Sequence, residues 1–339
     1  MTDMNLKLGE VLGDPRIRLI AADAIRKKDI REDEIWNKTL AQLREDHFGG
    51  DLQHGFDRLF SAAESGKWYY PLYSGAECRE SPPREGTNLV WFPSQDPGAA
   101  ERPYILLVPG GGFVNVWNLT EGWPVAAQFN DLGYHVFILT YQVEGGPCRL
   151  GREMEDFARA ITLIRSREKE FGVRWDSYIT CGFSAGGYLI CLWNVAEKGH
   201  AAFGLPGPRA SFPIYPWVSL KLDAENADDE DDFDPESDDE LFGCTPKEAA
   251  ESPFEIPDHV RGFPPCAVFA AAEDTLVIPE HSRRLAAALE KHGIPCRLEI
   301  GPTGGHGFAD ATGMCMAGWT ERAVRWYESL QRDQENPAR

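Results

Sequence analysis

The first eighty residues carry short apolar stripes at helical spacing. Apolar side chains recur every three or four residues over 14–25, and this spacing predicts an amphipathic helix. A second helix is expected over 31–45, ended by Gly49-Gly50, and a short third helix over 56–63. We expect residues 1–80 to form a helical N-terminal extension packed on the rest of the chain. Because the stripes are short, an independent interaction module is the less favoured alternative.

From residue 87 onward, continuous apolar runs alternate with helical stripes. Short runs of this kind are typical of strands buried on both faces of a sheet. The runs occupy 89–92, 104–108, 134–141, 178–183, 210–215, 266–271 and 297–300, and the stripes occupy 152–171, 279–291 and 317–330. This alternation predicts an α/β fold with a mostly parallel, twisted sheet and helices on both faces. We assign residues 81–333 to this domain.

The alternation stops over 221–264, where the chain is acidic and then rich in proline. Residues 223–240 hold twelve Asp or Glu and no Lys or Arg. A run of like charges is typical of a solvated loop, so we expect an insertion over one end of the sheet. Calcium binding is the alternative because calcium prefers carboxylate ligands, but the run lacks the Asp-x-Asp-x-Asp-Gly spacing of an EF-hand.

Charge and composition exclude several classes of function. The net charge of −20 opposes binding to nucleic acids and to anionic membranes. No apolar stretch approaches the roughly 18 residues of a membrane helix, and the N-terminus lacks the pattern of a secretory signal. The eight Cys show no C-x-x-C spacing, which favours a reduced state. We therefore expect a cytoplasmic protein.

The strongest chemical signal is the segment Gly182-Phe183-Ser184-Ala185-Gly186-Gly187. It joins a predicted strand to a predicted helix, which is the setting of a nucleophile elbow. Glycines on both sides of Ser184 avoid collisions in the tight turn that exposes the hydroxyl. The helix N-terminus that follows favours developing negative charge. The alternative is a Gly/Ser turn without chemistry.

A serine nucleophile needs a base, and the base needs an orienting carboxylate. His306 lies in Gly304-Gly305-His306-Gly307, just after the last predicted strand, and the glycines let this loop bend toward Ser184. The competitors His281 and His292 flank a predicted helix. Asp274 follows the strand before and is the expected carboxylate, with the adjacent Glu273 as the alternative.

Pro109-Gly110-Gly111-Gly112 follows the buried run 104–108. Successive glycines after a buried strand suggest backbone amides presented to a ligand. We expect the N–H groups of Gly111, Gly112 and Ala185 to form an oxyanion hole. A flexible turn is the alternative.

Together these motifs resemble the α/β-hydrolase superfamily, and within it the bacterial acetyl-xylan-esterase-like and related carbohydrate esterases. The resemblance covers about residues 87–330. The segments that carry it are Pro109 to Phe113, Glu121-Gly122-Trp123-Pro124, the serine elbow, Asp274-Thr275-Leu276-Val277 and Gly305 to Phe308. Hormone-sensitive-lipase-like relatives carry His where Pro109 stands, and that His braces the glycine loop. Pro109 would brace it by rigidity instead, as in acetyl-esterase-like proteins that begin the motif with Pro.

The resemblance implies a serine carboxylesterase that cleaves acetyl or other short-chain esters, with acetylated sugars or oligosaccharides as its small-molecule substrates. It implies no metal and no organic cofactor. A peptidase of the prolyl-oligopeptidase type and a non-catalytic binder on a hydrolase fold are the alternatives. The sequence leaves open whether the chain forms a homo-oligomer, and whether residues 1–80 cover the active site.

Aromatic side chains near the predicted site are candidates for substrate binding. Phe113, Trp117 and Trp123 follow the glycine loop, and Tyr215-Pro216-Trp217 lies at the end of a predicted strand. Their crowding would favour a short acyl group. The alternative is that they belong to the core.

Overall fold

A computed structural model of the protein describes residues 1–26, 32–46, 50–143, 149–226 and 241–335. Its centre is one eight-stranded sheet in the order β1-β2-β4-β3-β5-β6-β7-β8. The strands from β4 to β8 along this order pair in parallel, whereas β1 and β2 are antiparallel to their neighbours. The predicted mostly parallel α/β sheet is therefore confirmed. The strands are β1 (Tyr69–Pro71), β2 (Asn88–Phe92), β3 (Tyr104–Val108), β4 (Val136–Thr140), β5 (Tyr178–Phe183), β6 (Ala210–Ile214), β7 (Cys266–Ala271) and β8 (Cys296–Gly301).

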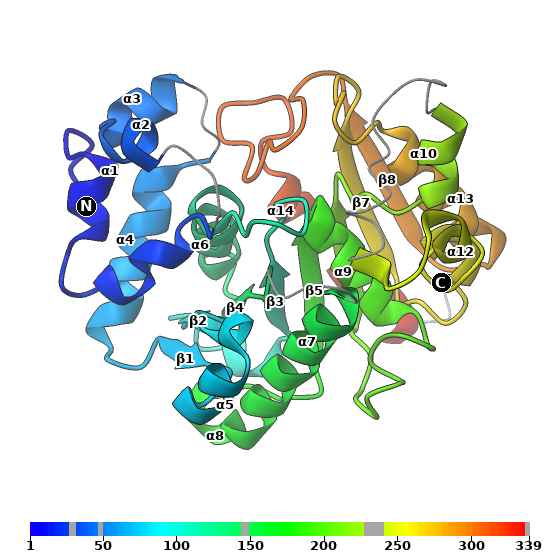
Figure 1. Ribbon diagram of the computed structural model, residues 1–339, viewed down its shortest axis with the longest axis horizontal. Helices are drawn as coiled ribbons and strands as arrows, with labels where there is room; N and C mark the ends of the chain where they lie inside the picture. Colours follow the sequence, from blue (N-terminus) through cyan, green and yellow to red (C-terminus); the bar gives the residue numbers. More distant parts are fainter. Residues whose placement is uncertain (27–31, 47–49, 144–148, 227–240, 336–339) are drawn as a thin grey trace.

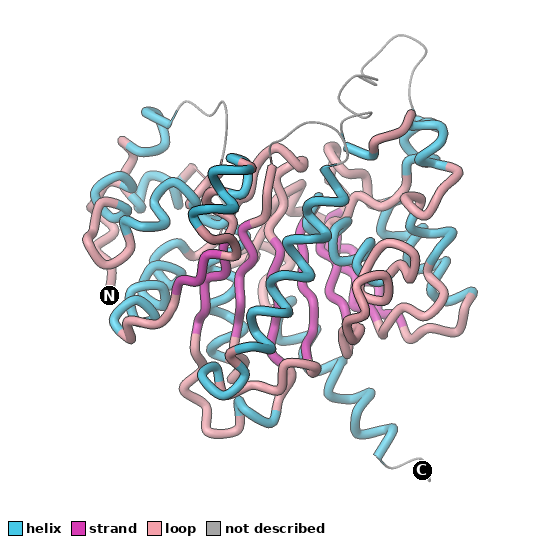
Figure 2. The backbone as a smooth tube through the Cα atoms, turned by 60° about the horizontal axis from the view of Figure 1, so that its bottom comes forward, coloured by secondary structure: helices cyan, strands magenta, loops and turns pink. Residues whose placement is uncertain are grey.

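Helices cover both faces of this sheet (Figures 1 and 2). Successive side chains of β3 point to opposite faces, so that Leu106 and Val108 join one apolar cluster while Ile105 and Leu107 join the other. The first cluster includes side chains of α7 (Arg149–Ser166), α9 (Ala185–Asn194) and α13 (Glu280–Lys291). The second includes side chains of α4 (Leu52–Glu64), α6 (Trp123–Asp131) and α14 (Trp319–Glu335). Every residue of β3 and β5 is buried, as the apolar run of β3 and the mostly apolar sequence of β5 predict.

The N-terminal segment packs against α6 through close contacts. A Cβ atom at Gly55 of α4 would lie 2.9 Å from the backbone nitrogen of Pro124, so only glycine lets the two helices approach this closely. The Phe56 and Trp123 rings lie 5.5 Å apart. Residues of this segment therefore share the second apolar cluster with the sheet. The domain boundary at residue 80 stays a prediction.

The helices of this segment differ from those expected. Instead of one helix over 31–45 there are two, α2 (Glu32–Trp36) and α3 (Leu40–Glu45). The break falls at Thr39, whose side chain and backbone exchange hydrogen bonds with Gln42 in a capping box. Over 14–25 the structure has a 3₁₀ helix, η1 (Arg18–Asp23), and an additional helix, α1 (Leu8–Leu12), precedes it.

Short elements complete the fold. Where one helix was expected over 152–171, α7 ends at Ser166 and is followed by α8. The short helical elements are α5 (Gly75–Glu80), η2 (Pro82–Arg84), η3 (Ala99–Glu101), the π-helical turn η4 (Asn118–Gly122), α8 (Glu168–Phe171), α10 (Leu220–Asn226), α12 (Pro246–Ala250) and η5 (Ile256–His259).

The structure describes residues 221–226 and 241–264 of the insertion, which include α10, α12 and η5. Most of its acidic run, residues 227–240, lies outside the described residues. The alternative of calcium binding by this run therefore also falls outside them. The described ranges contain no group of three or more His, Cys, Asp or Glu arranged to hold a metal. None of the helices in these ranges is long and apolar enough to cross a bilayer.

Candidate active site

The loops that carry the predicted site meet at one edge of the sheet. Because β3, β5, β6, β7 and β8 run parallel, their carboxyl ends lie on the same side. In open α/β sheets, ligands bind beyond this edge. The loops after these five strands contribute, in chain order, Gly110, Ser184, Tyr215, Asp274 and His306.

Ser184 stands in a strained turn between β5 and α9. Its φ of 49° and ψ of −117° are rare for a residue with a side chain. A Cβ atom at Gly182 would lie 2.3 Å from the carbonyl oxygen of Gly186, and one at Gly186 would lie 2.1 Å from that of Val108. Glycine is therefore required at both positions. This geometry explains why strand, serine and helix can follow one another so tightly.

Hydrogen bonds link Ser184 to His306 and His306 to Asp274. The Nε2 atom of His306 lies 2.9 Å from the Ser184 Oγ atom, and its Nδ1 atom lies 2.8 Å from Asp274 Oδ2. Since an ionised carboxylate only accepts hydrogen bonds, Nδ1 carries the proton and Nε2 is left to accept the serine O–H. The imidazole can thus take a proton from the hydroxyl.

The Asp274 side chain is buried and fixed by the loop after β7. Its Oδ1 atom accepts the N–H groups of Leu276 and Val277 at 3.0 and 2.9 Å, while Oδ2 is left for His306. The neighbouring Glu273 is exposed. This loop therefore orients one of its two carboxylates toward the imidazole and the other toward solvent.

The competing histidines occupy other environments. His281 is buried, where its Nδ1 atom accepts the N–H groups of Val218 and Ser219 and its Nε2 lies 3.1 Å from Asp223 Oδ1. The exposed His292 follows the last turn of α13, with Nδ1 2.9 Å from the Ala288 carbonyl oxygen. Of the three candidates, only His306 is hydrogen-bonded to Ser184.

The glycine loop after β3 passes directly over the serine. A Cβ atom at Gly110 would lie 2.5 Å from the Phe183 carbonyl oxygen and 2.9 Å from the Ser184 Cβ. Gly111 and Gly112 have positive φ angles of 138° and 61°. Both line the same cleft as Ser184 and Ala185. The amide of Ala185 belongs to the first turn of α9, where N–H groups lack intrahelical acceptors. The loop thus has the path that an oxyanion hole requires, and the donor roles stay a prediction.

Glu121 braces this loop, a role that the sequence analysis did not find. Its side chain is buried, its Oε2 atom accepts the Gly110 N–H at 2.6 Å, and its Oε1 atom accepts the Tyr215 O–H at 2.8 Å. Burial raises the pKa of this carboxyl above its usual range, and the two hydrogen bonds oppose the rise. Pro109 adds a further anchor, since its carbonyl oxygen accepts the Tyr141 O–H at 3.0 Å.

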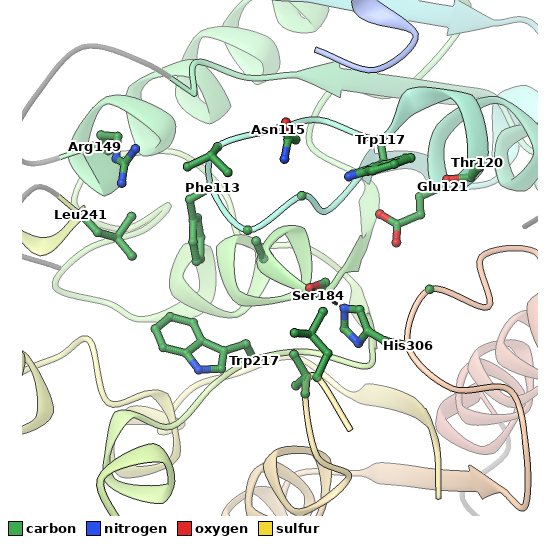
Figure 3. A pocket seen from close by; sticks show the side chains of 17 residues that line it. Phe113, Asn115, Trp117, Thr120, Glu121, Arg149, Ser184, Trp217, Leu241 and His306 are labelled. Atoms are coloured by element: carbon green, nitrogen blue, oxygen red, sulfur yellow. Dashed lines mark hydrogen bonds between the residues drawn. The ribbon is translucent and has the colours of Figure 1, made fainter. Parts of the chain in front are cut away.

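A cleft of about 790 Å³ opens above Ser184 (Figure 3). Three of the five aromatic side chains expected near the substrate, Phe113, Trp117 and Trp217, line it. Several other lining residues were not expected to bind substrate. These are Val114, Asn115, Thr120, Glu121, Arg149, Leu241, Leu276, Val277 and Gly307. The walls are therefore largely apolar, with a few polar groups.

Trp123 and Tyr215 are corrections to the expected lining. Trp123 is buried in the first turn of α6 and packs on Phe56, because α4 covers that side of the helix. Tyr215 is also buried, and its ring lies behind the His306 imidazole at a centroid distance of 4.9 Å. Its hydroxyl group accepts the Ala309 N–H at 3.2 Å. Both side chains therefore support the site from within the protein.

Comparison with known proteins gives one relative named as an esterase and one named as a xylanase. The chain is 24% identical over 232 residues to an acetylxylan esterase of Xylanibacter ruminicola and 26% identical over 230 residues to endo-1,4-beta-xylanase B of Butyrivibrio fibrisolvens. These matches cover 66% and 65% of this chain but only 44% and 34% of the relatives. The chain thus spans less than half the length of either curated relative.

Solved structures show the same architecture. The structure of an acetyl ester-xyloside bifunctional hydrolase from Caldicellulosiruptor lactoaceticus is similar with a TM-score of 0.63 and 27% identity, over 78% of this chain and 96% of that one. The carboxylesterase Cest-2923 from Lactobacillus plantarum is similar in fold, with a TM-score of 0.58 and 20% identity over 72% and 92% of the two chains. The sequence profile described as alpha/beta hydrolase fold matches residues 106–310, more than half of the chain. The protein therefore belongs to the alpha/beta hydrolase fold family.

Proposed function

We propose that this protein is a serine carboxylesterase that cleaves short-chain acyl esters, acetyl esters of sugars among them. The observation that carries the proposal is the hydrogen-bonded chain from Ser184 through His306 to Asp274, beside a loop of glycines. The names of the acetylxylan esterase and of the acetyl ester-xyloside hydrolase support the choice of acyl group.

The first half of the reaction forms an acyl-enzyme. The Nε2 atom of His306 accepts the proton of the Ser184 hydroxyl as Oγ attacks the ester carbonyl carbon. The carbonyl oxygen becomes an alkoxide that accepts hydrogen bonds from the backbone N–H groups of Gly111, Gly112 and Ala185. The imidazolium, held by Asp274, then gives its proton to the leaving alcohol oxygen, and the carbon–oxygen bond breaks.

The second half releases the acid. Water occupies the place of the alcohol, Nε2 of His306 takes one of its protons, and the oxygen attacks the acyl carbon. Collapse of this second tetrahedral intermediate returns the proton to Ser184 Oγ. Neither half requires a metal ion or an organic cofactor.

The cleft supports a preference for short acyl groups. The Phe113 ring packs edge-on against the rings of Tyr188 and Trp217, at centroid distances of 5.7 and 5.8 Å. Because neighbouring rings hold the Phe113 ring on two sides, it cannot easily move aside to make room for a long alkyl chain. We expect 4-nitrophenyl acetate to be hydrolysed with a higher kcat/KM than the octanoate. The opposite order would contradict the short-chain assignment.

Replacement of Ser184 tests the proposed function. Ser184→Ala should lower kcat for 4-nitrophenyl acetate by at least about 10⁴-fold, to the level of the uncatalysed reaction plus any residual binding effect. The control is Ser166→Ala at the end of α7, where the hydroxyl only caps the Leu163 carbonyl, and it should keep the wild-type rate. Wild-type activity in a folded Ser184→Ala protein would contradict the proposal. Faster cleavage of aminoacyl-proline amides than of acetyl esters would favour a peptidase.

A further inference from the structure

Arg149 places a positive charge in the wall of the cleft, and the proposed mechanism does not use it. It is the first residue of α7 and is partly buried. Among the cleft-lining residues that the structure describes, Arg149 alone carries a permanently positive side chain. A guanidinium group in an otherwise largely apolar wall is a specific feature that a neutral substrate does not need.

The guanidinium group of Arg149 forms no ion pair with a carboxylate of the described chain. Its Nε atom is buried without a hydrogen-bond partner, and no described carboxylate forms an ion pair with it. Glu153, one helical turn further along α7, is buried with both carboxyl oxygens unpartnered. Burial and the nearby Asp156 raise the pKa of Glu153 well above its usual range, whereas Arg149 and Arg152 oppose the rise. The shift favours the neutral acid, and a neutral carboxyl group leaves the charge of Arg149 to a ligand in the cleft.

Arg149 lies on the acyl side of the cleft. In the proposed reaction the leaving alcohol must sit beside His306, since Nε2 protonates its oxygen. The acyl group must then extend away from the imidazole. Figure 3 shows Phe113, Trp217, Leu241 and Arg149 on the opposite side of Ser184 from His306. Apolar side chains thus line the path of the acyl group, and a guanidinium group stands at its far end.

We propose that Arg149 binds a carboxylate at the end of the acyl group, so that half-esters of dicarboxylic acids form a preferred substrate class. The planar guanidinium matches a carboxylate through two parallel N–H···O bonds. This assignment rests on the proposed esterase function for the direction of the acyl group. It extends that function, because a neutral acyl group of the same length leaves the partly buried guanidinium without a partner.

Matched pairs of esters test the proposal. The anionic members are the mono-4-nitrophenyl esters of glutaric and adipic acid. The neutral partner of each ends in an isopropyl group, which has the shape of a carboxylate without its charge. Rates with Ser184→Ala protein are subtracted, because the carboxylate of a short half-ester also attacks its own ester bond. In wild-type protein we expect at least one anionic ester to exceed its neutral partner about tenfold or more in kcat/KM.

Variants of Arg149 should change this ratio. Arg149→Met should reduce the preference for the anionic ester by about 10- to 100-fold, the range of a charged hydrogen bond, and Arg149→Lys should keep part of it. The control is Arg165→Met on the same helix, whose guanidinium lies over the Trp175 ring, and it should leave the ratio unchanged. An unchanged ratio in Arg149→Met, or no anionic preference in wild-type protein, would overturn the proposal.

Two further measurements test whether Arg149 acts on the acyl side and whether it binds a carboxylate without turnover. The first compares an acetylated uronic acid with its neutral acetylated hexose; if Arg149→Met changes selectivity only for this pair, the acyl-side assignment is wrong. The second measures binding of monomethyl adipate to Ser184→Ala protein by calorimetry, which does not depend on turnover. Adding Arg149→Met to that protein should weaken binding about tenfold or more, and equal affinity would overturn the proposal even if Ser184 proved not to be the nucleophile.

Discussion

The carboxyl group of Glu121 accepts the backbone N–H of Gly110, with 2.6 Å between the nitrogen and Oε2. Its other oxygen accepts the Tyr215 hydroxyl. Gly110 directly precedes the glycines of the predicted oxyanion hole, and the Tyr215 ring contacts the His306 imidazole. One buried side chain therefore connects the loop after β3 with the residue behind the imidazole. We infer that Glu121 is a positioning residue for both halves of the site.

The Glu121→Gln variant should show whether Glu121 positions the groups of the site or contributes to substrate binding. An amide offers only one accepting oxygen, so either the Gly110 N–H or the Tyr215 O–H faces an NH₂ group. We expect kcat for 4-nitrophenyl acetate to fall about 10- to 100-fold with KM nearly unchanged, and stability to fall by about 1–3 kcal/mol. Steady-state kinetics and urea unfolding measure the two effects. A stability loss without a change in kcat would show that Glu121 is only structural.

Gly111→Ala should disturb the predicted oxyanion hole. Its new Cβ atom would lie 2.3 Å from the Asn115 carbonyl oxygen, so the loop must move and carry its N–H groups with it. Loss of one oxyanion donor costs about 10²–10³-fold in kcat. The matched control is Gly66→Ala, since Gly66 has a positive φ of 75° with no atom within 4 Å of the added Cβ. That variant should lose only about 1 kcal/mol of stability, with kcat unchanged. Equal kcat values in the two variants would refute the role of Gly111.

The adjacent carboxylates Glu273 and Asp274 provide a second matched comparison. Asp274→Asn keeps the shape of the side chain but removes the acceptor that holds the proton on Nδ1 of His306. We expect kcat to fall by about 10³–10⁴-fold. Glu273→Gln changes an exposed side chain and should leave kcat within about twofold of wild type. A similar effect of both substitutions would argue against the assigned orientation of His306.

Asp156 should make the protein more stable in mild acid than at neutral pH. Burial raises the pKa of this carboxyl to about 6, although Tyr73 and Gln142 donate hydrogen bonds to it. Its folded-state pKa exceeds the unfolded value of about 4, so the folded protein binds more protons between these values and stability rises as pH falls from about 7 to 4. The contribution is about 3 kcal/mol.

Urea unfolding at pH 7 and pH 5 measures this effect. Asp156→Asn should show a weaker rise in the free energy of unfolding toward pH 5 than wild type. The partly exposed Asp176→Asn should behave like wild type, since that carboxyl lies near the surface beside Arg174. An identical pH dependence in wild-type and Asp156→Asn protein would refute the raised pKa.

The sheet could be predicted because its signal is local. β3 and β7 coincide with unbroken apolar runs and β5 with a mostly apolar one, since strands buried on both faces favour apolar side chains. The edge strand β1 was missed because it is short. Tyr69–Pro71 pairs with β2 at three residues only, too few to show a strand pattern of apolar side chains. The prediction of one helix over 31–45 was wrong. The apolar stripe is continuous, but the capping box at Thr39 starts a new helix there.

Residues of the site were found where their type and their place after a strand are both distinctive, as for Ser184 and His306. Glu121 was missed because its partners lie 11 and 94 positions away in the sequence, and no local pattern reports such contacts. The prediction that Trp123 binds substrate was wrong for a related reason. Its place after the glycine loop suggested the cleft, but the packing of α4 on α6 decides which way the ring faces.

The central claim is that Ser184 is a nucleophile activated by His306, and labelling with a fluorophosphonate tests it most directly. We predict a single adduct, located on Ser184 by peptide mass spectrometry, and a labelling rate at least about 100-fold lower in folded His306→Ala protein. Failure to label, an adduct on another residue, or an unchanged rate in His306→Ala would contradict the account.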